Sequence, residues 1–479
     1  MKMKPRSDDT LIETGSFRDP SGFVFYHNDE VYRCVDDASW AVLSELQASG
    51  LLKKCVDSYH LVPSRLLDGD EAEKIQQLFE TPAHFVRHEK LDVVTYPYEW
   101  SFSMLLDAAV MHLKLQKKLV ENQWSLKDAT AFNIMFRYSE PVFIDLTSIE
   151  KPVRLDIWNA YGQFCKMFLY PIMLFRDRGI QPKQIFQSGI EGVDVDQAYR
   201  QLGFFKSIAP SRILDVYLQR RLNKHTFEQN KEVKQRLETK NTKNATQLVN
   251  LDRLIRKISG FRKKTRASGI WHDYQADNSY SDAARDQKHA YIESFLAAEK
   301  PATVLDLGCN TGEYSRLAVE AGARVISIDS DHDSVEQLYL LAKKNKWSIQ
   351  TILADLSNPP PDIGFMNQER KALMKRVSGD CVFALALIHH LHITGRIPLE
   401  GIAGMFAQLS NRFLIVEYID REDAMFQTLL SLREDIYQDM SVERFKAAFA
   451  GHFELRKEEK LNHTDRYMFT YEKKATPGA

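Results

Sequence analysis

The stretch Val304–Gly312, which reads VLDLGCNTG, decides the fold of the second half of this chain. An apolar run ends in Asp306, a glycine-containing turn follows, and the residues after the turn favour a helix. In an α/β protein this succession builds a nucleotide pocket at the carboxyl end of the first strand. The turn reads Gly-x-Asn-x-Gly, whereas dinucleotide-binding turns read Gly-x-Gly-x-x-Gly. A carboxylate would repel a pyrophosphate, which is negatively charged. Asp306 therefore favours a nucleotide-like ligand that carries an amine or a sulfonium cation.

An acidic residue also ends the next predicted strand. Arg324–Asp329 reads as a buried strand, and a helix over Ser315–Ala321 connects it to the first strand. Asp329 follows the glycine turn by about 20 residues, where an acid accepts hydrogen bonds from ribose hydroxyls. We therefore expect Asp329 and its neighbour Ser330 to contact the ligand.

Three further apolar runs complete the series. Ser348–Leu353 precedes Asp355 and Leu356, which we expect to accept the exocyclic amine of adenine and to pack on its ring. Cys381–Ile388 and Arg412–Glu417 are the fourth and fifth predicted strands. Strands that alternate with helical segments argue for one parallel sheet with helices on both faces.

With these motifs in this order, residues 267–479 resemble a class I S-adenosylmethionine-dependent methyltransferase domain. The matching segments are Leu305–Gly312, Asp329, Ala354–Leu356 and Ala386–Leu391. The resemblance implies a Rossmann-like fold, with a mainly parallel twisted sheet, and S-adenosylmethionine as the cofactor. The residues that it places around the cofactor are Asp306, Gly308, Cys309, Asn310, Gly312, Asp329, Ser330, Asp355, Leu356, Leu387 and Tyr280.

The loop after the fourth strand borders the transferred methyl group in this fold. His389 and His390 lie there and are the candidate catalytic bases, because an oxygen or carbon acceptor often needs one. The alternative is that the two histidines only begin a helix. Before the first strand, Trp271–Tyr274 and Ser279–Ser281 either form a lid over the cofactor or pack against the sheet.

The first half of the chain predicts an α+β domain. Gly22–Val35 reads as a hairpin with its turn at His27–Glu30. Trp40–Ser49, Asp70–Phe79 and Phe102–Val120 read as helices, the last with apolar residues at helical spacing.

A second group of motifs lies in Leu126–Asn133 and Pro141–Thr147. In kinases an aspartate base is followed five residues later by a metal-binding asparagine, and a second metal-binding aspartate comes after it. Asp128, Asn133 and Asp145 reproduce that spacing, so the region resembles the kinase-like superfamily. The resemblance implies Asn133 and Asp145 as metal ligands and ATP with Mg²⁺ as a further cofactor, if the site is intact.

The departures from the kinase pattern concern the phosphate clamp. Leu126 replaces the histidine of the kinase loop, Leu146 and Thr147 follow Asp145 in place of Phe-Gly, and no glycine-rich loop is present. Arg33 is the nearest basic residue to the strand lysine of kinases. Three interpretations stay open, namely a kinase-like fold without phosphotransfer, unrelated acids in loops, and an active kinase.

Length and composition set the remaining limits. A chain of 479 residues exceeds one hydrophobic core, and we predict domains at 1–221 and 267–479 with a polar helical connector at 222–266. The net charge of -1 and the absence of an Asn-Pro-Pro-Tyr motif argue against nucleic acid as the substrate. No apolar run is long enough for a membrane span. Five scattered cysteines indicate reduced thiols in a cytoplasmic protein.

The two halves together resemble a family of bacterial two-part methyltransferases that includes nodulation proteins. The resemblance implies methyl transfer from S-adenosylmethionine to a small-molecule, glycan or protein acceptor, with the first half recognising substrate or partner. One alternative is a bifunctional enzyme with ATP-dependent kinase-like activity in the first half. The other is a non-catalytic module that binds S-adenosylmethionine.

Overall fold

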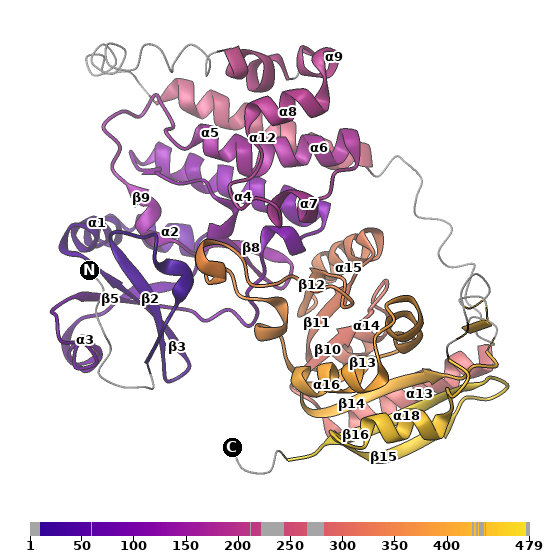
Figure 1. Ribbon diagram of the computed structural model, residues 1–479. Coiled ribbons are helices and arrows are strands. Elements are labelled where there is room, and N and C mark those ends of the chain that lie inside the picture. The colour runs from indigo at the N-terminus through magenta and orange to yellow at the C-terminus, as the bar shows by residue number, and fades with distance from the viewer. Residues whose placement is uncertain are drawn as a thin grey trace. The chain divides into compact units, whose positions relative to one another are not determined.

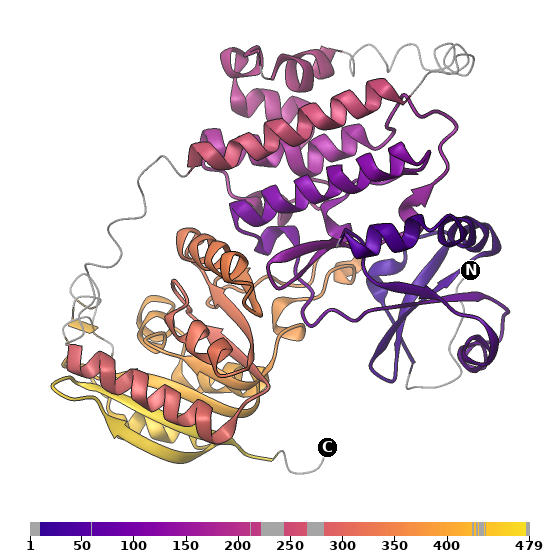
Figure 2. The same ribbon diagram turned by 180° about the vertical axis from the view of Figure 1, so that it is seen from behind.

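The computed structural model forms two compact units (Figures 1 and 2). The described residues are 10–58, 60–210, 212–221, 244–265, 282–423, 426–427, 430, 435 and 437–475. The first unit comprises Met1–Ser268 with Asp362–Arg370, and the second comprises Gly269–Pro361 with Lys371–Ala479. A short segment from the second half of the chain is therefore part of the first unit.

The first unit begins with an antiparallel sheet of five strands in the order β1-β2-β3-β5-β4. The strands are β1 (Thr10–Ile12), β2 (Gly22–His27), β3 (Glu30–Val35), β4 (Ser64–Leu66) and β5 (His84–His88). The predicted hairpin is confirmed, since β2 pairs with β3 around a turn at Asn28 and Asp29. Both turn residues have positive φ, 49° and 63°, as a two-residue hairpin loop with the right twist requires.

The rest of the first unit is mainly helical. Its α-helices are α1 (Asp37–Ala48), α2 (Leu51–Asp57), α3 (Gly69–Gln76), α4 (Phe102–Glu121), α5 (Tyr161–Phe164), α6 (Tyr170–Arg178), α7 (Pro182–Phe186), α8 (Val195–Leu202), α9 (Phe204–Ser207) and α12 (Ala245–Thr265). The three helices expected in this half correspond to α1, α3 and α4, with boundaries that differ by a few residues. Short strands form two pairs, β6 (Ser125–Leu126) with β9 (Ile149–Glu150) and β7 (Ile134–Arg137) with β8 (Glu140–Phe143).

Helix α12 lies in the range predicted as a polar connector. It is helical as expected, but Leu251, Leu254 and Ile258 form a buried face, and the helix packs against α4. Its basic side chains Arg253 and Lys257 both pair with the carboxylate of Asp215, which is fully buried. The helix is thus a packed part of the first unit.

The second unit is built on a sheet of seven strands in the order β12-β11-β10-β13-β14-β16-β15. The strands are β10 (Thr303–Leu307), β11 (Arg324–Asp329), β12 (Ile349–Leu353), β13 (Gly379–Ala384), β14 (Ser410–Ile419), β15 (Phe453–Lys460) and β16 (Arg466–Lys473). The first five strands in this order are mutually parallel, and β16 runs antiparallel to both β14 and β15. This confirms the predicted mainly parallel, Rossmann-like sheet.

Helices cover both faces of this sheet. They are α13 (Asp282–Glu299), α14 (Glu313–Glu320), α15 (His332–Asn345), α16 (Leu399–Leu409) and α18 (Val442–Phe449). On one face Ile292, Leu317 and Leu338, from α13, α14 and α15, share one hydrophobic core with the inward-facing strand residues. On the other face Phe445 of α18 packs against Phe469, with ring centroids 5.4 Å apart.

The predicted fourth strand is wrong at its end. β13 stops at Ala384, and the chain leaves the sheet because Ala386 takes a positive φ of 53°. A π-helical turn, η10 (His390–Thr394), follows. The other short turns are the 3₁₀-helices η1 (Thr14–Ser16), η2 (Pro97–Glu99), η3 (Ala131–Asn133), η4 (Leu146–Ser148), η8 (Phe365–Asn367) and η9 (Leu373–Lys375), and the π-helices η5 (Cys165–Leu169) and η6 (Ile213–Leu218). Within the described parts of the chain, no helix combines the length and apolarity needed to cross a membrane.

Candidate functional site

The glycine turn connects the end of β10 to α14, and Gly308 N–H donates to the Ile328 carbonyl of β11 at 2.8 Å. Gly308, Asn310 and Gly312 have φ values of 70°, 48° and 86°, in the left-handed region that glycine and asparagine tolerate best. A Cβ added to Gly308 would lie 3.2 Å from Leu387 Cδ1, and one added to Gly312 would collide with Leu338. The two glycines therefore let the turn approach the loop after β13 and helix α15.

Asp329 is held at the carboxyl end of β11 by the backbone around it. Its Oδ2 accepts a hydrogen bond from the Asn310 backbone N–H at 2.8 Å, and its Oδ1 accepts one from Asp331 at 2.8 Å. Desolvation raises the pKa of this carboxyl above its ordinary value, although the backbone donors oppose the shift. Ser330, next in the chain, is exposed. The result is an oriented carboxylate beside the glycine turn, with lone pairs left for further donors.

Asp306 is more deeply placed than the sequence suggested. The residue is 2% exposed, and its carboxylate accepts a hydrogen bond from Ser315 Oγ at 2.6 Å. Burial raises the pKa of Asp306 to about 6, against the opposing effects of Ser315 and Lys288. The hydrogen-bond partner of Asp306 is thus Ser315 of α14, and the Asp306 carboxylate lies beneath the turn. Cys309 is buried, as expected for a small side chain in a tight turn.

The residues that follow β12 form a compact turn. Asp355 Oδ1 accepts hydrogen bonds from the Ser357 backbone N–H at 2.8 Å and from Ser357 Oγ at 2.6 Å, and Leu356 is buried. Leu387, the predicted contact from the loop after β13, is half-buried against Gly308. Tyr280 and the predicted lid at 271–274 and 279–281 lie outside the described residues.

The two candidate bases differ in their surroundings. His389 is 4% exposed, and burial lowers its pKa to about 3. Within the described part of the chain its Nδ1 has no hydrogen-bond partner. His390 is exposed, its ring is tilted by 40° against that of His389 with centroids 4.2 Å apart, and partial desolvation lowers its pKa, an effect that Asp329 opposes. Both rings are therefore neutral at pH 7.

A buried ionic network beside these histidines was not predicted as a unit. Lys288 Nζ of α13 lies 2.6 Å from Glu417 Oε2 at the end of β14, and the two side chains are 4% and 0% exposed. Arg466 contacts the same carboxylate at 3.6 Å and also pairs with Asp423 at 2.8 Å. The sequence feature that could have indicated this network is Lys288, a lysine at a position on the apolar face of α13.

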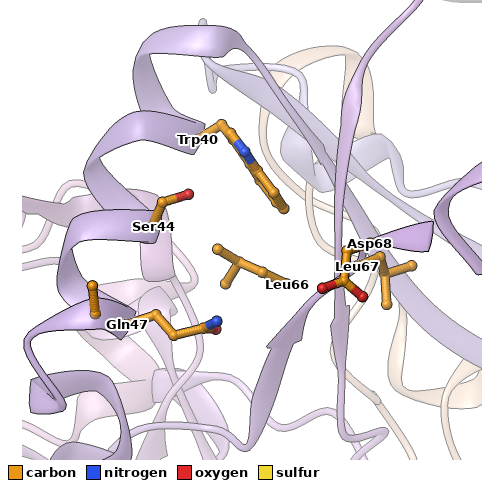
Figure 3. Close-up of a pocket in the computed structure, with 7 residues that line it drawn as sticks. Trp40, Ser44, Gln47, Leu66, Leu67 and Asp68 are labelled. Carbon is orange, nitrogen blue, oxygen red and sulfur yellow. The ribbon is translucent and has the colours of Figure 1, made fainter.

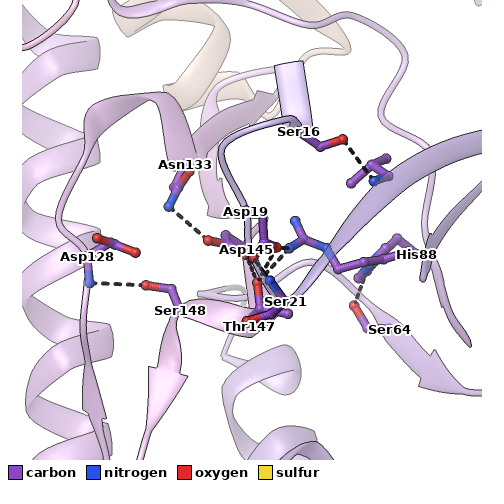
Figure 4. Close-up of polar contacts among 12 residues, drawn as sticks. Ser16, Asp19, Ser21, Ser64, His88, Asp128, Asn133, Asp145, Thr147 and Ser148 are labelled. Carbon is purple, nitrogen blue, oxygen red and sulfur yellow. Dashed lines mark hydrogen bonds and ion pairs between the residues drawn. The ribbon is translucent and has the colours of Figure 1, made fainter. Parts of the chain in front are cut away.

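In the first unit, the kinase-like residues form a closed set of polar contacts (Figure 4). Arg33 Nη1 of β3 lies 2.9 Å from Asp19 Oδ2 and 2.8 Å from Asp145 Oδ1. Asn133 Nδ2 donates to Asp145 Oδ2 at 3.2 Å, and Thr147 Oγ1 donates to Asp145 Oδ1 at 2.7 Å. The two predicted metal ligands are thus brought together, but both carboxylate oxygens of Asp145 already have protein partners.

Two further residues, Asp128 and Glu45, bear on the comparison with kinases. The pKa of Asp128 is raised, first by desolvation and then by the nearby charge of Asp145. Glu45 on α1, the helix after β3, pairs with Lys151 and not with Arg33. Among the residues that the structure describes, no cluster of three or more His, Cys, Asp or Glu side chains could hold a metal ion.

A cavity of about 390 Å³ lies elsewhere in the first unit, between α1 and the end of β4. Figure 3 shows Trp40, Gln47 and Leu66 around it. The lining residues are Trp40, Ser44, Gln47, Ala48, Leu66, Leu67 and Asp68. They include none of the residues that the sequence singled out.

Solved structures of methyltransferases match part of this chain. The magnesium protoporphyrin IX methyltransferase of Synechocystis PCC 6803 with bound SAH is 17% identical, and the match covers 45% of this chain and 94% of that chain with a TM-score of 0.31. The N-methyltransferase NodS of Bradyrhizobium japonicum WM9 with S-adenosyl-l-homocysteine is 10% identical, and the match covers 44% of this chain and 97% of that chain with a TM-score of 0.31. The bifunctional kinase-methyltransferase WbdD is 18% identical, and the match covers 39% of this chain and 38% of that chain with a TM-score of 0.27.

No protein-family model matches the chain. A curated relative, however, matches nearly all of it. Nodulation protein NoeA of Rhizobium meliloti (strain 1021) is 32% identical over 464 residues, which are 96% of this chain and 95% of the relative. With this identity over almost the full length of both proteins, the chain belongs to the family of nodulation protein NoeA.

Proposed function

We propose that the second unit transfers a methyl group from S-adenosylmethionine to an acceptor molecule. The observation that carries the proposal is the Asp329 carboxylate, held by two backbone N–H groups beside a glycine turn. A fixed carboxylate at the end of the second strand is placed to accept hydrogen bonds from the two hydroxyls of a ribose. The sheet order puts the ends of β10, β11, β12 and β13 at the same edge.

The residues at this edge fit the proposed cofactor. Gly308 lets the turn pack closely against Leu387, and Asp355 and Leu356 offer an acceptor and an apolar surface for adenine. The negative charge of Asp306 under the turn suits the amine and sulfonium groups. When bound, the cofactor would supply an electrophilic methyl carbon.

For the acceptor we propose that His390 takes up the proton that the attacking atom loses. Its ring is neutral at pH 7 and exposed, whereas the neighbouring His389 is buried and is placed to support it. We propose a small molecule, a glycan or a protein as the acceptor. The name of the relative, a nodulation protein, points to no single one of these.

We propose that the first unit is a kinase-like fold that acts in recognition and not in phosphoryl transfer. Kinases need a free cation on β3 to clamp phosphates and a free aspartate to hold Mg²⁺. Here Arg33 and Asp145 neutralise each other, and Asp19 adds a carboxylate on the same guanidinium. This favours a unit without nucleotide turnover, and ATP with Mg²⁺ should leave its thermal unfolding unchanged.

The test is calorimetric titration with S-adenosylmethionine and S-adenosylhomocysteine. Asp329→Asn should weaken binding by about tenfold or more, because a hydrogen bond to a charged acceptor contributes about 1.5–3 kcal/mol. Asp380→Asn is the matched control, since Asp380 also accepts two backbone N–H bonds, from Ala302 and Thr303, but at the amino end of the same sheet. Equal losses in the two variants, or no binding by the folded wild type, would refute the proposal.

A further inference from the structure

The connection between β12 and β13 is unusual because its tip, Asp362–Arg370, belongs to the first unit. We call this tip the arm. It is closed on itself by two backbone hydrogen bonds, from Ile363 N–H to the Arg370 carbonyl at 3.0 Å and from Arg370 N–H to the Ile363 carbonyl at 3.1 Å. In Figure 1 the arm is the orange segment next to the strands of the first unit.

Glu369 anchors the arm. Its side chain is 1% exposed and pairs with the guanidinium of Arg18, from the loop between β1 and β2. The same carboxylate accepts a hydrogen bond from the Phe365 backbone N–H at 2.7 Å. A buried carboxylate needs such partners, because leaving it unpaired costs several kcal/mol. The ion pair therefore links the shape of the arm to its place on the first unit.

The β1–β2 loop contacts the arm at three further points. Thr14 Oγ1 donates to the Gln368 carbonyl at 2.6 Å, and the ring of Phe17 stacks on Phe365 with centroids 5.5 Å apart. A Cβ added to Gly15 would lie 2.7 Å from the Glu369 carbonyl oxygen. The loop and the arm are thus in close contact along their backbones.

The arm also reaches the loop that carries the kinase-like residues. The guanidinium carbon of Arg370 lies 4.7 Å from the centre of the Phe132 ring, and Phe132 directly precedes Asn133. In kinases the loop between the first two strands covers the phosphates, and the loop with the catalytic aspartate lies opposite. The arm contacts the counterparts of both loops, the β1–β2 loop and the loop that carries Asn133.

The arm is joined to the proposed cofactor site by a short and stiff piece of chain. Asp355 and Leu356 stand six or fewer residues before Pro361, and Pro359, Pro360 and Pro361 fix three successive φ angles. Proline runs act as semi-rigid spacers. On the return path, Leu373 N–H donates to the Pro360 carbonyl at 3.0 Å, which ties the two legs of the connection together. The chain between the arm and the turn after β12 is therefore short, and its two legs are hydrogen-bonded to each other.

We propose that the first unit serves as a docking site for the arm, and that this docking holds Asp355 and Leu356 in position for the cofactor. Arg18 and Glu369 are then positioning residues for a site that they do not touch. This rests on the proposed function of the second unit. It also gives the β1–β2 loop a partner from within the chain, in place of a nucleotide.

The experiment combines hydrogen exchange of the full-length protein with calorimetric titration of S-adenosylhomocysteine. Arg18→Ala removes the ion pair, and Gly15→Ala forces the two backbones apart. Both should speed exchange in peptides that cover 362–370 and weaken binding about fivefold or more. The controls are Arg65→Ala, which breaks the exposed ion pair between Arg65 of β4 and Glu71 of α3, and Gly162→Ala, whose added Cβ meets nothing within 4 Å.

The control variants should change neither quantity. Faster exchange in the arm with unchanged binding would overturn the positioning role, and unchanged exchange in both test variants would overturn the docking itself. If wild type does not bind S-adenosylhomocysteine, the proposed function fails and the positioning role fails with it. In that case the exchange data still decide whether the arm is docked.

Discussion

Replacing Asp306 with asparagine tests how the structure treats the acid beneath the glycine turn. Burial raises the pKa of this carboxyl from 3.8 to about 6. That difference corresponds to about 3 kcal/mol, because each pKa unit is worth about 1.4 kcal/mol. A raised pKa in the folded state means that the folded protein holds the proton more tightly than the unfolded chain does. The stabilisation that this tighter proton binding gives the folded protein is complete below pH 3.8 and is lost as the pH rises through about 6.

Asparagine keeps the acceptor for Ser315 Oγ and does not titrate. Between pH 4.5 and pH 8 wild type should therefore lose about 2 kcal/mol that Asp306→Asn does not lose. The assay is the urea midpoint of the second unit at both pH values, followed by hydrogen exchange in peptides from β10 and β13. Asp380→Asn controls for the removal of a carboxylate elsewhere in the same sheet.

A difference between variant and wild type that does not change with pH would refute this reasoning. The reasoning would also be refuted if the stability that Asp306→Asn loses relative to wild type were larger at pH 8 than at pH 4.5. The first result would mean that Lys288 and Ser315 balance the cost of burying the Asp306 charge, and the second that they outweigh it.

Three further substitutions test the packing and the charges. Gly312→Ala should cost about 1–3 kcal/mol, because its Cβ would collide with Leu338 at a φ of 86°, and an unchanged melting temperature would contradict this. Glu417→Gln removes the carboxylate that pairs with the buried Lys288 and should cost about 3–5 kcal/mol in urea unfolding, whereas adding Lys288→Met should recover much of the loss. If the double variant is as unstable as the sum of the singles, the ion pair is not the cause. Arg33→Met removes the cation between two carboxylates and should lower the melting temperature, so an unchanged melting temperature would count against the pairing.

Much of the fold could be predicted from local patterns. The strand Arg324–Asp329 has the bounds that its apolar run indicated, and the turn at Asn28 and Asp29 lies within the range expected for the hairpin. These elements depend on side-chain alternation and turn chemistry, which neighbouring residues determine. The end of the fourth strand was mispredicted, because Leu385–Ile388 is as apolar as a strand but leaves the sheet at Ala386.

The candidate site was predictable in part. Spacing along the chain indicated Gly308, Asn310 and Asp329, and the structure brings them together because parallel strands end at one edge. The partners of Asp306 and Asp145 were not predictable. Ser315 and Arg33 reach them only through packing, and their effect on charge depends on burial.

The sequence by itself determined the alternation of strands and helices in the second half, the glycine turn and the acids that end two of the strands. These features follow from local periodicity and from backbone conformations that few residues can adopt. Only the tertiary structure decided that Lys288 pairs with Glu417, that Arg33 neutralises Asp145, and that residues 362–370 join the first unit. Each of these depends on contacts between residues more than 100 positions apart, and no local pattern encodes which distant charge will share a buried space.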